Sequence, residues 1–279
     1  MSVKKEASKV ASNPAVNIFI RVGNGARGYL FFIMGLLALQ MALGKISETV
    51  DYQGAIAATA ARPLGKFLLV IVLIGLVVYV LWALACALFD LLHVGHKLKG
   101  LFKRALLLIN AVIYGLLLPM LVVYISSGSD KTGSQNFSIA RLATTIFLLP
   151  GGKWLVAIVG AVLIVLGLFT VYSGFRRDFD KETRSYSLSP RQVTWIKLAG
   201  RFGTIAYGII IVVIGVLFFA AFTHADPLKA TGVDGALLSL IKWPFGRWLL
   251  GFIALGLLSY GIYLALIALW FRTRASQKV

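Results

Sequence analysis

Six long apolar runs limit what this chain can fold into more than any other feature of its sequence. Each is close to the ~20 residues that an α-helix needs to cross a hydrocarbon core of ~30 Å. Because a backbone in lipid must satisfy its own hydrogen bonds, runs of this length form helices. The sequence therefore predicts an all-α integral membrane protein with six transmembrane helices, at residues 22–43, 67–92, 105–125, 154–175, 203–223 and 248–271.

Composition and charge agree with a membrane protein. The chain is 59% hydrophobic and 14% charged, whereas soluble domains average about 45–50% apolar and about 25% charged residues. A net charge of +18 suggests nucleic acid binding in a soluble protein. Here, however, the cations lie between the apolar runs, so no nucleic acid partner is expected. The single cysteine, Cys86, excludes an intrachain disulfide, and no group of ligand residues points to a metal or another cofactor.

The distribution of Lys and Arg predicts the orientation. The N-terminal segment, the loops after spans 2 and 4, and the C-terminal segment carry most of the 28 basic residues. Cytoplasmic segments are the ones enriched in Lys and Arg. We therefore expect an inner-membrane protein with both termini in the cytoplasm. Membrane lipid is the expected partner, including anionic headgroups at the inner basic loops, above all the loop 176–201.

A short box of the form Pro-x-Gly-basic occurs three times, each time directly before an apolar run. Five residues around the start of the first span also recur at an offset of 180, namely Arg21, Gly23, Ala26, Gly28 and Gly35 as Arg201, Gly203, Ala206, Gly208 and Gly215. Three two-helix repeats follow, in the same orientation, which favours a pseudo-threefold bundle of hairpins. The predicted segments are a cytoplasmic lead (1–14), repeat 1 (15–98), repeat 2 (99–190), repeat 3 (191–272) and a cytoplasmic tail (273–279).

The loop between the two spans of each repeat is too apolar for a free loop. The apolar stretches cover residues 55–61, 137–149 and 235–243, and each ends close to the proline of a box. They are too short to cross a membrane. We expect short helices there, lying at the outer interface or packed onto the mouth of the bundle.

The boxes and a set of spaced glycines are the main candidates for structural roles. Proline and glycine set a turn, and the cation anchors the start of the next helix at the interface; a shared site for a lipid headgroup is the alternative. Glycines seven residues apart share a helix face and allow close packing in lipid, with a glycine-lined path as the alternative. The candidate residues are Pro63, Gly65, Lys66, Pro150, Gly152, Lys153, Pro244, Gly246, Arg247, Gly28, Gly35, Gly208 and Gly215.

Arg27 and Asp90 are the most informative charges. Arg27 lies about a turn inside the first span, and Asp90 lies near the end of the second. In an antiparallel hairpin the two would lie at similar depth. Since charges in spans are costly and are usually paired, we predict a structural ion pair within repeat 1.

These motifs resemble a family of bacterial membrane proteins. The helix starts Arg27-Gly28-Tyr29 and Tyr207-Gly208, the seven-residue glycine step and the Pro-x-Gly-basic box are similar to those of domain of unknown function 1206. Members of that family carry paired transmembrane helices in three copies. The resemblance covers residues 15–272 and is weaker in the middle repeat, where Val122 and Val162 replace glycines. It implies the six-helix architecture and no particular activity.

For function, the sequence favours a non-enzymatic interaction protein, such as a scaffold or an accessory component with a membrane-protein partner. No acid, base or nucleophile cluster is recognisable, and no charge lies near the middle of an apolar run. The alternative is a channel or carrier for a small solute or ion along the pseudo-threefold axis. A polar residue such as Asn110 facing that axis would favour the alternative.

Overall fold

Six long helices make up most of the molecule. The computed structural model describes residues 14–45, 50–90, 98–127, 139–176, 190–241 and 244–270. Each long helix contains a stretch long and apolar enough to cross a membrane, and the described residues contain no strand. The predicted all-α architecture with six long apolar helices is confirmed. The helices are α2 (Pro14–Ala42), α4 (Gly65–Phe89), α5 (Leu98–Ser127), α7 (Gly152–Arg176), α9 (Pro190–His224) and α11 (Gly246–Trp270).

Two of these helices begin at a proline well before their apolar runs. The sequence predicts spans from residues 22 and 203, whereas α2 begins at Pro14 and α9 at Pro190. Proline is favoured in the first turn because its missing N–H would be unsatisfied there anyway. The first thirteen residues, the predicted tail 273–279 and residues 177–189 of the basic loop lie outside the described residues.

One short helix connects the two spans in each of the three repeats, as the sequence predicts. These helices are α3 (Tyr52–Ala60), α6 (Ile139–Phe147) and α10 (Val233–Ile241), with a 3-10 turn, η2 (Pro227–Lys229), between α9 and α10. Helix α3 packs on α2, α4 and α5, and α10 packs on α9 and α11. Ile56 and Leu237 are 0% exposed, so α3 and α10 belong to the packed mouth of the bundle.

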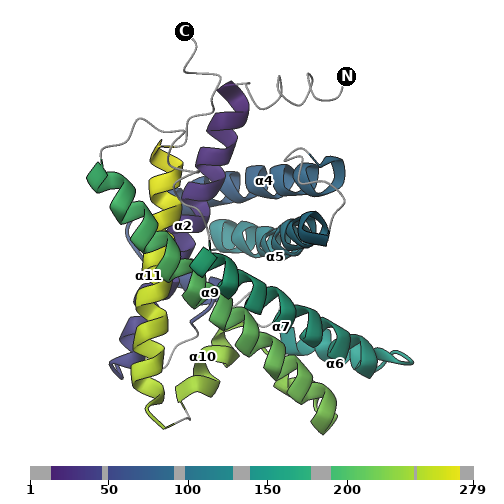
Figure 1. The fold of residues 1–279 in the computed structure, drawn as a ribbon. Helices are drawn as coiled ribbons and strands as arrows, with labels where there is room; N and C mark the ends of the chain where they lie inside the picture. The colour runs from purple at the N-terminus through teal and green to yellow at the C-terminus, as the bar shows by residue number, and fades with distance from the viewer. Residues whose placement is uncertain are drawn as a thin grey trace.

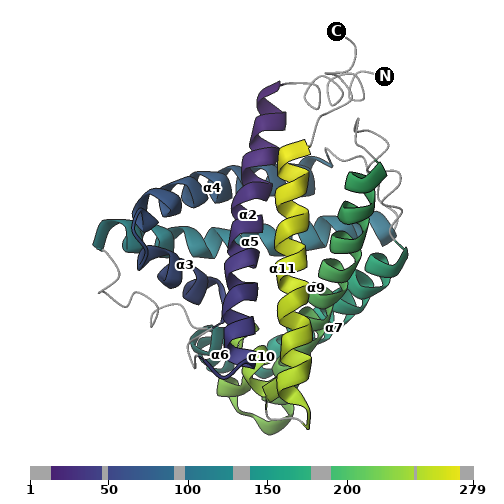
Figure 2. The same ribbon diagram turned by 90° about the vertical axis from the view of Figure 1, so that its left-hand side faces the viewer.

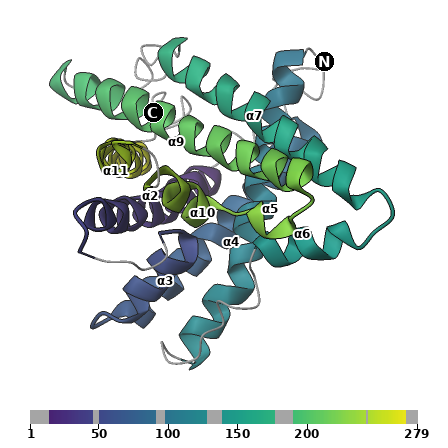
Figure 3. The same ribbon diagram turned by 90° about the horizontal axis from the view of Figure 1, so that it is seen from below.

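The long helices pack as three pairs, and each pair joins two different repeats. Helix α2 packs along α11, α4 along α5, and α7 along α9 (Figure 1). Helices α2 and α11 stand upright in Figure 2, with α4 and α5 lying across them. Seen from below, the three pairs point in different directions (Figure 3). The two helices of one repeat therefore cross steeply and do not form the antiparallel hairpin expected from the sequence.

Glycines explain why α2 pairs with α11. A Cβ added to Gly28 would lie 2.9 Å from the carbonyl oxygen of Gly261, and one on Gly35 would lie 2.7 Å from the nitrogen of Leu258. Such distances leave no room for a side chain, so the two backbones are in direct contact. Arg21 closes the same pair, because its Nε donates to the carbonyl of Ala268 at 2.6 Å, in the last turn of α11.

The same device joins α7 to α9. A Cβ on Gly208 would lie 2.8 Å from the nitrogen of Val171, and one on Gly215 would lie 2.8 Å from the carbonyl oxygen of Gly160. Helix α7 carries its own series of glycines seven residues apart, Gly160, Gly167 and Gly174. Close backbone contact of this kind is the usual means of packing helices in lipid.

The two helices of repeats 1 and 3 cross at one point, which is also lined by glycine. In repeat 3, a Cβ on Gly203 would lie 2.5 Å from the Cα of Tyr260. In repeat 1, a Cβ on Gly23 would lie 3.0 Å from the Cβ of Tyr79. Equivalent positions of the two repeats therefore make equivalent contacts.

Repeat 2 departs from this pattern, and its residues explain why. At the positions of Gly203 and Gly256 it has Asn110 and Val162, whose side chains would obstruct a crossing of the same kind. Helices α5 and α7 are accordingly not among the closely packed pairs of the described helices. In a ring of three repeats every neighbouring pair of helices would pack, so the threefold arrangement is incomplete at this point.

Each Pro-x-Gly-basic box is a sharp left-handed turn. Its second residue has a positive φ in all three copies: 67° at Leu64, 77° at Gly151 and 62° at Phe245. The following glycines are buried, and a Cβ on any of them would collide with a carbonyl of the preceding short helix. The three cations, Lys66, Lys153 and Arg247, are exposed. Helices α7 and α11, which the second and third boxes precede, begin far apart in Figure 1, so these cations do not form one site.

These turns make a direct stability prediction. A left-handed conformation costs an L-residue about 1–2 kcal/mol, and Leu64 is 78% exposed, so it gains little by packing. Leu64→Gly should therefore raise the thermal stability of the purified protein by about 0.5–1 kcal/mol, after allowing for the entropy that glycine adds to the unfolded chain. The reverse change, Gly151→Leu, should lower it. Equal melting temperatures for both variants would contradict the strained turn.

Candidate functional site

A buried arginine lies at the centre of the molecule, about halfway along α2. Arg27 is only 7% exposed. Its guanidinium carbon lies 4.3 Å from the centre of the Tyr79 ring on α4 and 5.1 Å from that of the Tyr114 ring on α5. Both distances are within the range of a cation–π interaction, which is strongest when the cation is desolvated.

Further aromatic residues complete the shell around this arginine. Tyr114 is 0% exposed, and its ring meets that of Tyr79 edge to face at 5.3 Å. Its hydroxyl lies 3.2 Å from that of Tyr52 on α3. Phe31, one turn after Arg27 on α2, meets the ring of Tyr207 at 5.3 Å and that of Tyr260 at 4.8 Å. Helices of all three repeats therefore contribute to the shell.

Corresponding positions of the repeats converge here. In the internal alignment, Arg27 corresponds to Tyr114 in repeat 2 and to Tyr207 in repeat 3. Tyr207 stacks on Tyr260, with ring centres 5.2 Å apart and an interplanar angle of 8°. The Arg27–Tyr79 contact occupies the same place in repeat 1. One repeat has thus exchanged a stacked tyrosine pair for a cation over a tyrosine face.

The positive charge of Arg27 has no carboxylate partner among the described residues, and its Nε has no hydrogen-bond acceptor there. The ion pair with Asp90 predicted from the sequence is therefore not what the structure contains. Asp90 is the residue that ends α4, in a left-handed conformation. It lies eleven residues beyond Tyr79, about 16 Å along the helix at 1.5 Å per residue. The steep crossing of α2 and α4 brings Arg27 to Tyr79 and not to the end of α4.

Two other buried polar atoms also lack partners in the described chain. They are the Oδ1 of Asn110 on α5 and the Oγ1 of Thr204 on α9. Asn110 lies about one turn before Tyr114, and Thr204 lies about one turn before Tyr207. With Arg27, the first long helix of every repeat therefore contributes one unsatisfied polar group. Buried polar groups are nearly always hydrogen-bonded, so a water molecule or a solute is the expected partner of such atoms.

The side of the shell next to α3 is hydrogen-bonded. The hydroxyl of Tyr29 lies 3.0 Å from Oγ1 of Thr59, which itself donates to the carbonyl of Ala55 at 2.7 Å. Burial, and then the neighbouring Tyr114, raise the pKa of the Tyr52 phenol well above its ordinary value. Tyr52 therefore stays protonated at physiological pH and remains able to donate a hydrogen bond.

The described residues hold no group of three or more His, Cys, Asp or Glu that could bind a metal ion. The centre offers a fixed positive charge and phenol hydroxyls, which suit the binding of a polar solute. Tyr52, Tyr207 and Tyr260 each keep part of their surface exposed, so the shell is not closed on every side.

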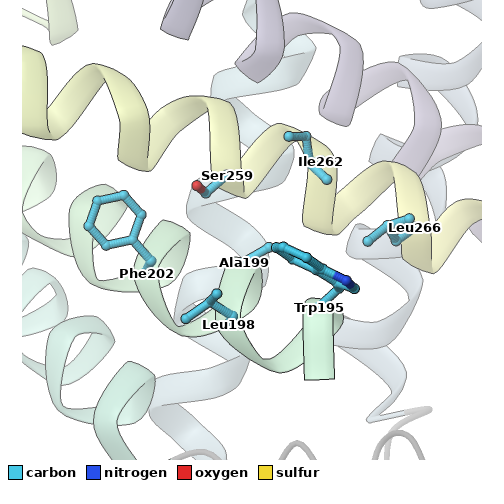
Figure 4. Close-up of a pocket in the computed structure, with 7 residues that line it drawn as sticks. All are labelled: Trp195, Leu198, Ala199, Phe202, Ser259, Ile262 and Leu266. Atoms are coloured by element: carbon cyan, nitrogen blue, oxygen red, sulfur yellow. The ribbon is translucent and has the colours of Figure 1, made fainter. Parts of the chain in front are cut away.

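A separate apolar pocket lies between α9 and α11, away from Arg27. Its volume is about 580 Å³, and Ser259 is the polar residue among those drawn in Figure 4. The indole of Trp195 lies beneath Ile262 and Leu266 of α11 in that view. The lining residues are Trp195, Leu198, Ala199, Phe202, Ser259, Ile262 and Leu266.

Comparison with known proteins places this fold in a family. The model of a family described as Domain of Unknown Function (DUF1206) matches the chain three times, at residues 22–90, 106–177 and 202–270. The chain belongs to this family. The three DUF1206 matches correspond to α2–α4, α5–α7 and α9–α11, which confirms the three tandem repeats predicted from the sequence.

One relative of this DUF1206 protein is similar over almost its entire length. It is the Bacillus subtilis (strain 168) protein described as uncharacterized protein YxxB, 32% identical over 256 residues that cover 91% of each chain. No solved structure matches the chain significantly. The comparisons thus support a membrane-spanning helical protein of the DUF1206 family and assign it no activity.

The aromatic shell of this DUF1206 protein was missed by sequence reasoning, although one signal was present. The internal alignment already placed Arg27, Tyr114 and Tyr207 at one repeat position. Convergence of that position at the centre was not foreseen, because each repeat was treated as a separate hairpin. The glycine series of α7 was also overlooked, although its seven-residue step is visible in the sequence.

Proposed function

We propose that this DUF1206 protein is a non-enzymatic carrier of the inner membrane, with both termini cytoplasmic, that binds a small polar solute at the centre around Arg27. The observation that carries the proposal is the set of three buried polar atoms without partners, one on the first helix of each repeat. Charged residues within membrane-spanning segments are costly and usually mark a binding site or pathway.

The sequence favoured a scaffold because no charge lies near the middle of an apolar run. Arg27 weakens that argument, since its side chain is 7% exposed and lies against aromatic rings within the apolar stretch Arg21–Ala42. Asn110 is the residue whose position was expected to distinguish a scaffold from a carrier. Its Oδ1 is buried and has no hydrogen-bond partner among the described residues. Both observations favour the carrier.

Membrane lipid is the proposed partner outside this centre. The pocket between α9 and α11 has an almost entirely apolar lining and suits an acyl chain. Exposed basic residues such as Arg191 and Arg201 flank it on α9. These would attract anionic headgroups.

Flux through purified protein in liposomes tests the carrier. Osmotic re-swelling after mixing with glycine, acetamide or sodium acetate should be faster in proteoliposomes than in empty liposomes for at least one of these solutes. The double variant Asn110→Leu/Thr204→Val removes two of the unsatisfied polar groups and should lower the rate about tenfold or more, because the loss of a buried hydrogen-bond partner costs about 1–3 kcal/mol per group.

Two results would count against the carrier. One is re-swelling no faster than in empty liposomes for all three solutes. The other is an unchanged rate in the double variant. A stoichiometric membrane protein that co-purifies with such an inactive chain would instead support the scaffold predicted from the sequence. The variant Thr223→Val is a control for the change at Thr204, because Thr223 is an exposed threonine of the same helix whose hydroxyl donates to the carbonyl of Ala220.

A further inference from the structure

We infer that the solute held at the centre is a small carboxylate anion, and that the Arg27 guanidinium is the group that binds it. Transport of this anion rests on the proposed function, whereas its binding to Arg27 is tested by an experiment of its own.

Arg27 is 7% exposed, and its guanidinium lies against the rings of Tyr79 and Tyr114. An arginine remains protonated in proteins. Ring faces offset only part of the cost of removing a cation from water. The centre therefore lacks one negative charge, and an anion supplies it where a neutral solute or a cation does not.

The Nε–H of Arg27 has no acceptor among the described residues. Together with the Nη–H on the same side of the guanidinium, it can donate two parallel hydrogen bonds to a carboxylate. A spherical halide ion cannot lie along both N–H directions at once, so it cannot make two linear hydrogen bonds to this edge. A carboxylate is the anion whose two oxygens match this pair of donors.

The rings of Tyr79 and Tyr114 lie 4.3 Å and 5.1 Å from the guanidinium carbon, so the anion has to be small. Entry from the less buried side requires movement of Tyr207 or Tyr260, both of which are partly exposed. The hydroxyls of Tyr52 and Tyr114 are hydrogen-bonded to each other at 3.2 Å, and the one that accepts in this bond can donate its own O–H to an oxygen of the anion.

The chain itself supplies a matched variant. Tyrosine occupies the position of Arg27 in the other two repeats, and in repeat 3 it stacks on the counterpart of Tyr79. Arg27→Tyr is therefore expected to fold while removing the charge. Arg27→Lys keeps the charge but loses the two-donor edge. Arg21→Gln is the control, because Arg21 is an exposed arginine of the same helix that binds the end of α11.

The experiment measures the melting temperature of the purified full-length protein in detergent, in sodium acetate, acetamide or sodium chloride at equal concentration and ionic strength. Acetate should raise the melting temperature of the wild type and of Arg21→Gln by several degrees. The shift should be smaller in Arg27→Lys and absent in Arg27→Tyr. Acetamide should give no shift, and chloride should give a smaller one than acetate.

An equal shift with acetamide would overturn the anion, and an equal shift with chloride would overturn the carboxylate. An acetate shift retained in Arg27→Tyr would place the anion elsewhere. If Arg27→Tyr does not fold, comparing the three solutes on the wild type and on Arg27→Lys still tests whether Arg27 binds a carboxylate. Acetate binding without flux in liposomes would uphold the site and reject the carrier, whereas flux of acetamide but not acetate would uphold the carrier and reject the anion.

Discussion

Gly203→Val should abolish the stably folded protein, because the α9–α11 crossing leaves no space for a side chain. A Cβ at this position would lie 2.5 Å from both the Cα and the nitrogen of Tyr260. These are backbone atoms, so no rotamer change relieves the clash and the two helices must move apart. Inserting methyl groups into a well-packed core costs about 1–3 kcal/mol, and we expect about 3 kcal/mol or more here.

The measurement is the yield of monodisperse protein after size exclusion together with its melting temperature. Gly115→Ala is the matched control, since a Cβ there meets no atom within 4 Å. Alanine is the better helix former by about 0.8–1 kcal/mol, so this variant should be at least as stable as the wild type. If Gly203→Val proves as stable as Gly115→Ala, the close crossing is not part of the native fold. The clash also displaces Tyr260 from Tyr207, so any remaining folded protein should lose its response to acetate.

Arg27→Glu should be the most damaging change at the centre. It places a carboxylate against the ring faces of Tyr79 and Tyr114, which now hold a cation at 4.3 Å and 5.1 Å. The faces of aromatic rings carry negative charge and repel an anion. An uncompensated buried charge typically costs about 3–5 kcal/mol. The folded protein should therefore be recovered in much lower yield, with a correspondingly lower melting temperature.

Arg27→Tyr, in contrast, should be close to the wild type in stability, because a neutral group of suitable shape replaces an unpaired charge. Arg21→Glu tests whether any charge reversal on α2 is harmful. Arg21 is exposed and donates to the last carbonyls of α11, so its reversal should cost only about 1 kcal/mol. Equal losses in the two glutamate variants would mean that the location of Arg27 has no special importance.

The candidate site shows how far internal repetition can be interpreted. The glycine positions and the correspondence of Arg27 with Tyr114 and Tyr207 follow from the sequence alone. The Arg27–Asp90 pair was wrong because similar depth was assumed for helices that in fact cross steeply. Contact with Tyr79 depends on where α2 crosses α4, and that point is set by Gly23 on one helix and Gly75 on the other.

The sequence by itself determined the number of long apolar helices, the three repeats and the short helices between their spans. These features depend on runs of apolar residues and on turn residues, which act over short distances along the chain. Only the tertiary structure decided which helices pair. The glycine series that begin at Gly28 and Gly208 show which face of each helix packs closely, but not which helix packs against it. In both cases the partner is a helix of another repeat. The central arginine therefore became apparent only once all three repeats were placed together, because its shell comes from residues more than 200 positions apart in the chain, such as Phe31 and Tyr260.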